Sequence, residues 1–379
     1  MNRKEKLQFI ILRGAVAIFL ALLMAAILIF LSVDEPSWGE RLNATAKAME
    51  NLLIRPFVNA RGAISIKNIT DILAGMTPII FTGLATCVMF SANLFNLGAE
   101  GGIMLGAFVA SLAAIYVPMP AGIHMVAAVL AGSLATGAMM LIPGVLKAKL
   151  DVSEMVNSLM LNYVIMYFIK FLMNTYFADK SKGSLQTMNF LPTSAVPELI
   201  SNGSKLTAGF LIAIFFVIIT AIFMKKTRWG YSIRMIGLNQ DFAKYSGIRV
   251  ASVMVLAQVL GGILAGMGGA LEVLGRDTAF AWSSLPGYGW TGITIACIAG
   301  NNPVLVPFAA FFMSYLSKGC NLMASNSGVA SQLMDIIQAV IFVFFAAEHF
   351  LSGYKQRMVV KSVKKTAELQ DAEQQGGNL

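Results

Sequence analysis

Polar residues and glycines interrupt the apolar sequence at a segment early in the chain. The segment reads Asn93-Leu-Phe-Asn96-Leu-Gly98-Ala-Glu100-Gly-Gly102 and lies between two apolar runs. Irregular backbone at such a place survives only where it is buried in protein or lines a watery cavity, into which the next helix would point free N–H groups. The segment therefore predicts the lining of a polar path, with an ordinary turn at the membrane surface as the alternative.

A second group of polar residues has helical spacing. Glu154, Ser158 and Asn162 follow one another at intervals of four and share one face of a helix. Polar stripes on an apolar helix face the interior of a bundle or a polar path. For Glu154 the alternative is a cap at the start of the helix, whereas Asn162 lies deeper in the apolar run.

A third segment, from Arg276 to Trp290, combines charges, aromatic rings, glycines and Pro286 between two apolar runs. Its aromatic rings could stack on a flat ring such as a nucleobase, and the alternative is an aromatic belt at a membrane interface. The first and third segments share one plan, in which an apolar helix ends in a Gly-rich polar break before another short helix. This plan resembles the broken-helix pairs of repeat-built transporters.

The sequence lacks the motifs of ATP hydrolysis, of nucleophilic catalysis and of proton-coupled transport. The sequence contains no G-x-x-x-x-G-K-S/T phosphate loop, no nucleophile–base pair and no ladder of buried carboxylates or arginines. Its three cysteines and two histidines are widely spaced. We therefore expect no disulfide framework, no metal site and no cofactor.

The composition indicates which elements must position these groups. The 379 residues are 57% hydrophobic and only 12% charged, with a mean hydropathy of +0.72, whereas a soluble domain carries about 25% charged residues. Continuous apolar runs of roughly 17–25 residues indicate membrane-spanning helices and not barrel strands. We predict an all-α polytopic membrane bundle, with residues 1–354 as the transmembrane domain and residues 355–379 as a charged cytoplasmic tail.

The apolar runs predict about ten spans, one or two of them half-helices. The net charge of +9 reflects Lys and Arg collected on cytoplasmic loops, so it does not indicate nucleic acid, and it places both termini in the cytoplasm. Glycine pairs such as Gly102/Gly106 and Gly262/Gly266 predict close helix contacts. The predicted spans are residues 9–31, 72–92, 101–117, 123–146, 155–177, 207–224, 251–274, 287–299, 304–318 and 333–351.

A basic, polar segment at residues 225–250 separates two of these apolar runs. A loop this rich in Lys and Arg stays in the cytoplasm. Its make-up indicates a docking surface more than a simple connection.

At these motifs the chain resembles the permease subunits of bacterial ABC importers for ribose, other simple sugars and nucleosides. The resemblance runs from about Ile72 to Pro303, and its motifs are closer to the nucleoside branch, although Gly102 stands where that branch commonly has Gln. The segments that carry it are FNLGAEGGIMLGAF, SEMVNSLMLNY, MIGLNQDFAKYSGI, GGILAGMGGALEVLG and GYGWTGITIACIAGNNP.

The resemblance implies a multi-pass protein of the bacterial cytoplasmic membrane that imports a nucleoside or a related simple sugar. It also implies three protein partners: a separate ATPase subunit, a second permease subunit, identical or different, and an extracytoplasmic solute-binding protein or lipoprotein. Membrane lipid surrounds such a chain, and nucleic acid is not a partner. Because these permeases have no catalytic residue of their own, the chain is not expected to be an enzyme.

Two groups of site residues follow from the motifs and the resemblance. The expected pathway or substrate contacts are Phe95, Asn96, Glu100, Asn162, Tyr288 and Trp290. The resemblance implies that residues 237–248 form a coupling helix that inserts into a groove of the ATPase, with Gly237, Asn239, Ala243, Tyr245 and Gly247 as the coupling residues. The alternative function is a stand-alone secondary carrier or channel for a small polar solute, and a membrane enzyme has no candidate cluster.

Overall fold

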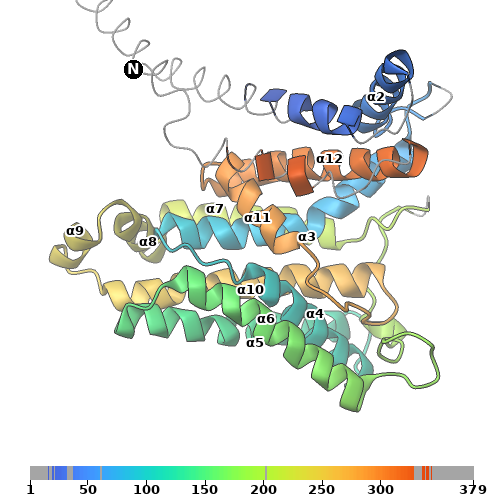
Figure 1. The fold of residues 1–379 in the computed structure, drawn as a ribbon. Coiled ribbons are helices and arrows are strands. Elements are labelled where there is room, and N and C mark those ends of the chain that lie inside the picture. Colours follow the sequence, from blue (N-terminus) through green and yellow to red (C-terminus); the bar gives the residue numbers. More distant parts are fainter. Residues whose placement is uncertain are drawn as a thin grey trace, which may run out of the picture. The chain divides into compact units, whose positions relative to one another are not determined.

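The computed structural model describes residues 37–327 except 60–61 and 201–202, together with residues 16, 19–20, 22–31, 335–337, 339–340 and 343. Within these ranges the regular elements are helices and two isolated bridges, so the all-α prediction is confirmed (Figure 1). The α-helices are α2 (Trp38–Leu53), α3 (Ile66–Ser91), α4 (Ala99–Tyr116), α5 (Ile123–Leu150), α6 (Glu154–Leu172), α7 (Gly209–Lys226), α8 (Arg228–Leu238), α9 (Gln240–Tyr245), α10 (Val250–Arg276), α11 (Tyr288–Ile298) and α12 (Val306–Ser327).

The chain divides into two compact units. One comprises residues 50–322, and the other comprises residues 1–49 with residues 323–379. All of the predicted site residues lie in the first unit. The predicted cytoplasmic tail, residues 355–379, lies outside the described residues.

Seven of the described helical segments are long and apolar enough to cross a membrane. They correspond to seven of the ten predicted spans, and α6 reaches Phe177 through an additional π-helical turn. The predicted span at 287–299 is the 11-residue helix α11, which is about half the length that a bilayer requires. The predicted first span is described only in part, as the apolar helix Leu22–Leu31, and the predicted last span lies largely outside the described residues. The ten-span count and the orientation of the termini therefore stay predictions.

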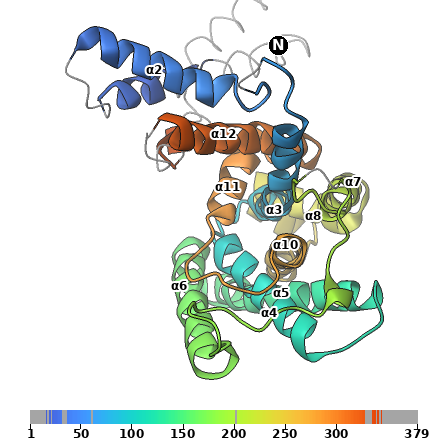
Figure 2. The ribbon, with the colours of Figure 1, turned by 90° about the vertical axis from the view of Figure 1, so that its right-hand side faces the viewer.

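Helix α10 is central to the larger unit, where it packs against α3, α4 and α5 (Figure 2). Glycines, including the predicted Gly106 and Gly266, allow close contacts between these helices. A Cβ atom on Gly106 of α4 would overlap the backbone of Gly266 in α10, and a Cβ on Gly132 of α5 would overlap the carbonyl oxygen of Gly106. In lipid, where apolar side chains gain little from leaving the solvent, such backbone contact is a main source of helix association.

We expect Gly106→Ala to destabilise the protein by about 1–3 kcal/mol, because the added methyl group must push α4 away from α10. The midpoint of thermal unfolding in detergent measures this effect. Gly183→Ala is the matched control, since a Cβ at Gly183 would meet no heavy atom within 4 Å. Equal midpoints for the two variants would contradict the close contact.

Candidate functional site

The first predicted polar segment is a break between two membrane helices. Helix α3 ends at Ser91 and α4 begins at Ala99, and Asn93 between them has a left-handed backbone with φ 56°. Asn96 in the middle of the break is completely buried. Asn93 and Phe95 beside it are exposed, so the break lies partly inside the bundle and partly at its surface. Whether it lines a polar path stays a prediction.

Helix α6 supplies the side chains that satisfy this irregular backbone. The Phe95 N–H donates to Glu154 Oε1 at 3.1 Å, and the Leu97 N–H donates to Ser158 Oγ at 2.9 Å. Asn162 serves two groups: its Oδ1 accepts from the Gly101 N–H at 2.9 Å, and its Nδ2 donates to the Leu97 carbonyl at 3.0 Å. The predicted polar stripe therefore faces the bundle interior, and each of its members binds the α3–α4 segment.

Asn96 connects the break to α10. Its Nδ2 donates to Gln258 Oε1 at 2.7 Å, while its Oδ1 accepts from the Gly98 N–H at 2.7 Å. Gln258 is completely buried, and its Nε2 has no hydrogen-bond partner among the residues that the structure describes. Sequence reasoning missed Gln258, although a lone amide in the apolar run VASVMVLAQVL is itself a signal of a polar site.

Glu100 caps the N-terminus of the short helix α11. One carboxylate oxygen accepts from the Gly287 N–H and the other from the Gly289 N–H, each at 2.5 Å. A carboxylate at this position satisfies two N–H groups that have no partner within α11 and complements the positive end of the helix dipole. Gly289 has no room for a side chain, because a Cβ would lie 2.5 Å from the Glu100 nitrogen.

Tyr288, between these two glycines, is held by two further helices. Its hydroxyl donates to Glu272 Oε1 of α10 at 3.0 Å, and Arg276 donates to the same oxygen at 2.9 Å. Its carbonyl accepts from Thr82 Oγ1 of α3 at 2.9 Å. The first turn of α11 is therefore fixed by side chains from α3, α4 and α10. Sequence reasoning did not select Glu272 or Thr82.

The predicted pathway residues differ in what they can reach. Asn96, Glu100 and Asn162 are buried and bound to backbone groups. By contrast, Phe95 is 52% exposed and packs its ring on Phe90, and Trp290 is 37% exposed. Tyr288 is partly exposed. Phe95, Trp290 and Tyr288 therefore have surface that could meet a solute in this conformation, and whether any of the six residues touches one stays a prediction.

The loop before α11 lies against another loop and an aromatic cluster. Thr187 binds Phe280 through both its backbone and its hydroxyl, each at 3.0 Å, and the Phe280 ring contacts those of Phe108 and Trp282. Trp282 in turn lies 6.2 Å from Tyr288, centroid to centroid. Partial burial raises the pKa of the Asp277 carboxyl in this loop, and nearby Lys205 opposes that rise. The predicted aromatic segment is thus packed into the unit at Phe280 and reaches the α11 turn at Tyr288.

The coupling helix predicted at residues 237–248 is interrupted at Asn239, because residues 237–238 end helix α8 and residues 240–245 form the short helix α9. Asn239 separates them and caps α9, accepting from the Phe242 N–H at 2.9 Å, while Gly247 ends the segment at φ 82°. Ala243 is completely buried, and Tyr245 is 91% exposed. Two of the five expected coupling residues therefore shape the turns, one packs inside, and Tyr245 is free to meet a partner.

Gly237 joins this segment to the α3–α4 break. A Cβ at Gly237 would overlap the carbonyl oxygen of Ser91 and lie 3.3 Å from the Asn93 nitrogen. Helix α8 therefore lies directly on the end of α3, where the break begins. Arg234, Lys244 and Arg249 are exposed around the segment.

The sequence matches known transport proteins over most of its length. Residues 68–346 match the family model described as "Branched-chain amino acid transport system / permease component". A nucleoside ABC transporter permease of Lactococcus lactis is 31% identical over 93% of both chains. A guanosine ABC transporter permease of Bacillus subtilis is 31% identical over 76% of this chain and 82% of its own, and a glucose ABC transporter permease of Haloferax volcanii is 32% identical over 76% and 78%. No solved structure matches the chain.

We expect Glu100→Gln to lower the free energy of unfolding by about 1–3 kcal/mol, because the amide offers one acceptor oxygen to two N–H groups and leaves one of them unpaired. The measurement is thermal unfolding in detergent. Glu198→Gln, at an exposed loop position, is the control and should unfold at the native temperature. If both variants unfold at that temperature, Glu100 does not hold α11.

Proposed function

Because the chain belongs to the permease family of branched-chain amino acid transport systems, we propose that it is the permease subunit of an ABC importer for a nucleoside or a related simple sugar. The observation that carries this proposal is the extent of the match, which includes nearly all of α3, every later described helix and the α8–α9 segment. Two relatives with nucleoside names and one with a glucose name define the range of solutes. The protein lies in the cytoplasmic membrane.

Energy for such transport must come from a partner, since the sequence has no phosphate-binding loop. The α8–α9 segment is the proposed docking site for an ATPase subunit. Leu238, Phe242 and Tyr245 are exposed there, which is an apolar surface that a groove in the partner would cover. The surrounding Arg234, Lys244 and Arg249 suit acidic groups at its rim.

The contact between Gly237 and Ser91 supports a route by which docking acts on the pathway. A shift of α9 would move α8, which lies on the end of α3. The α3–α4 break begins there and continues into α4, whose Glu100 holds the first turn of α11. Tyr288 and Trp290 in that turn, together with Phe95, are the proposed solute contacts, and two such half-pathways from paired permease subunits would alternate access.

A solute-binding protein outside the membrane is the third proposed partner. The face opposite α8–α9 includes the 178–208 loop, which is hydrogen-bonded to the ends of α4 and α10 through Leu191–Ala114 and Val196–Leu274. These bonds give the loop a defined position over the helices. That makes it a suitable surface for receiving a solute from a separate protein.

The alternative is a secondary carrier or channel that works alone. We expect the purified chain in proteoliposomes to show no guanosine, uridine or ribose uptake driven by an ion gradient. Uptake should appear when the ATPase subunit, the second permease, the solute-binding protein and ATP are supplied together. Concentrative uptake by the chain alone would overturn the importer proposal, and competition among the three solutes identifies the preferred one.

We expect Tyr245→Ala to reduce co-purification of the ATPase subunit and ATP-driven uptake at least tenfold, because an exposed aromatic ring at the centre of an interface is a typical hot spot. The unfolding temperature of the isolated chain should not change, since the ring is 91% exposed. Tyr176→Ala, in the last turn before the 178–208 loop, is the control and should retain assembly. Normal assembly of the Tyr245 variant would remove α9 from the interface.

A further inference from the structure

A buried carboxyl group near the end of α10 holds the hydroxyl of Tyr288. Glu272 lies one turn before Arg276, the last residue of that helix, and is only 4% exposed. Its Oε1 accepts from the Tyr288 hydroxyl at 3.0 Å and from Arg276 Nη1 at 2.9 Å. The carboxyl group therefore joins α10 to the side chain of the first residue of α11.

The stability of the fold does not require a charged group at this place. A carboxyl group that leaves water for the interior of a membrane protein loses much of its hydration, and a single ion pair rarely returns more than that cost. The pair of Glu272 with Arg276, four residues on, adds little to a helix. A well-packed apolar side chain would serve the fold at least as well. An ionisable residue inside a span is therefore a candidate for function, together with the group that it holds.

The backbone of Tyr288 is fixed independently of Glu272. Its carbonyl accepts from Thr82 Oγ1 at 2.9 Å, and Glu100 binds the N–H groups of the residues on either side. These bonds hold the peptide groups but leave the side chain free to rotate about its χ angles. The hydroxyl bond to Glu272 fixes the far end of the ring.

The Tyr288 ring has few neighbours that would hold it in another way. Its two neighbours in the sequence are glycines, which carry no side chains to restrict it. Among the ring contacts of the described residues, it pairs with Trp282, at 6.2 Å between centroids and an interplanar angle of 57°. Tyr288 is partly exposed, as is Trp290 in the same turn. The direction in which the ring presents its exposed surface therefore depends on Glu272.

The last turn of α10 is also attached to the 178–208 loop. The Val196 N–H donates to the Leu274 carbonyl at 3.2 Å, and Lys205 Nζ donates to the Arg276 carbonyl. The Arg276 side chain is 42% exposed, so it reaches the surface while it holds the buried carboxyl group. That carboxyl group is thus linked on one side to the loop proposed to receive the solute, and on the other side to a proposed solute contact.

From these contacts we propose that Glu272 is a positioning residue for transport, which holds the Tyr288 ring in the direction where it meets the solute. This inference rests on the proposed function, in which Tyr288 contacts the solute. Glu272 itself does not touch the solute, and Arg276 fixes the position of its carboxyl group. A nucleobase or a sugar that leaves the binding protein meets a ring already in place, which lowers the ordering cost of the contact.

The test compares solute import with ATP hydrolysis in the complete complex. The full chain is assembled in proteoliposomes with the ATPase subunit, the second permease and the solute-binding protein, and guanosine, uridine and ribose are supplied in turn at saturating concentration. We expect Tyr288→Phe and Glu272→Gln each to lower the number of solute molecules imported per ATP hydrolysed by about tenfold, because a solute that is not held at α11 escapes before access alternates. A residue that only stabilises the fold would lower both rates together.

A double variant, Glu272→Gln with Tyr288→Phe, separates positioning from direct contact. If the carboxyl group acts through the hydroxyl, the double variant should import as much solute per ATP as the poorer single variant. Losses that multiply would show that the two groups act on the solute separately, and they would overturn the proposal.

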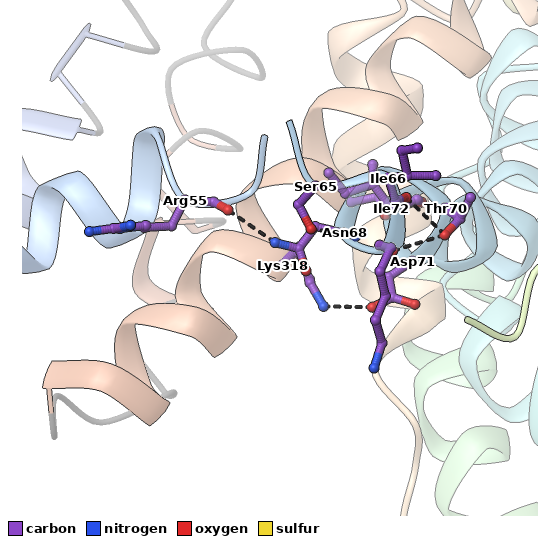
Figure 3. A network of polar contacts seen from close by, with 10 residues as sticks. Arg55, Ser65, Ile66, Asn68, Thr70, Asp71, Ile72 and Lys318 are labelled. Carbon is purple, nitrogen blue, oxygen red and sulfur yellow. Dashed lines mark hydrogen bonds and ion pairs between the residues drawn. The ribbon is translucent and has the colours of Figure 1, made fainter. Parts of the chain in front are cut away.

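The matched control is Asp71→Asn, which removes an ion pair between two other helices. Asp71 Oδ2 of α3 lies 2.7 Å from Lys318 Nζ of α12 (Figure 3). This variant loses a charged contact of similar length and should import as much solute per ATP as the native chain. An equal loss in the control would show that the ratio reports general damage, which would also overturn the proposal.

The outcomes distinguish this proposal from the proposed function. If the native complex imports none of the three solutes, the proposed function fails and the role of Glu272 fails with it. If the native complex imports a solute and a folded single variant keeps the native ratio, only the role of Glu272 is overturned. If Glu272→Gln does not fold, Tyr288→Phe still tests the bond, because it leaves the carboxyl group with Arg276. Amide exchange of residues 287–291 in the isolated chain should then rise several-fold, and native protection would contradict the anchor.

Discussion

The constraint on which this structure depends concerns backbone N–H and C=O groups where a membrane helix is interrupted. These groups must find hydrogen-bond partners in the protein, because little water reaches them. An unsatisfied N–H or C=O in such an environment costs several kcal/mol. The chain meets this constraint with side chains: α6 supplies Glu154, Ser158 and Asn162 to the α3–α4 break, and α4 supplies Glu100 to the start of α11. The positions of these helices are therefore linked through hydrogen bonds as well as through packing.

The same constraint separates polar groups that hold the fold from groups that can meet a solute. Asn96 and Asn162 are each occupied by backbone atoms, so a solute would have to compete with those bonds to reach them. The rings of aromatic side chains do not hold backbone groups in this way. Trp290 and Phe95 retain exposed surface beside the two breaks, and a ring face can contact sugars and bases without leaving a backbone group unpaired.

The sequence alone predicted elements and faces better than partners. The helices of the larger unit follow from apolar runs, and the shared face of Glu154, Ser158 and Asn162 follows from their spacing, because both signals lie within one element. Tertiary packing brings this face to residues 95–101, and it brings Glu100 to Gly287 at a separation of 187 residues. The local spacing of residues does not predict either contact. Gln258 and Glu272 were not selected from the sequence. Each is a single polar residue in an apolar run, and helical spacing identifies a polar face only where at least two polar residues recur.

Helix α3 shows how the two sides of the molecule are connected. Its first turns are tied to α12 through Asp71 and Lys318, and its last residue supports α8 through Ser91. Between them lies Pro78, which has no N–H and so removes one hydrogen bond from the helix interior. The Thr82 hydroxyl, one turn on, lies 3.3 Å from the Pro78 carbonyl and 2.9 Å from the Tyr288 carbonyl of α11. The interruption at Pro78 thus lies one turn before the residue through which α3 holds the first turn of α11.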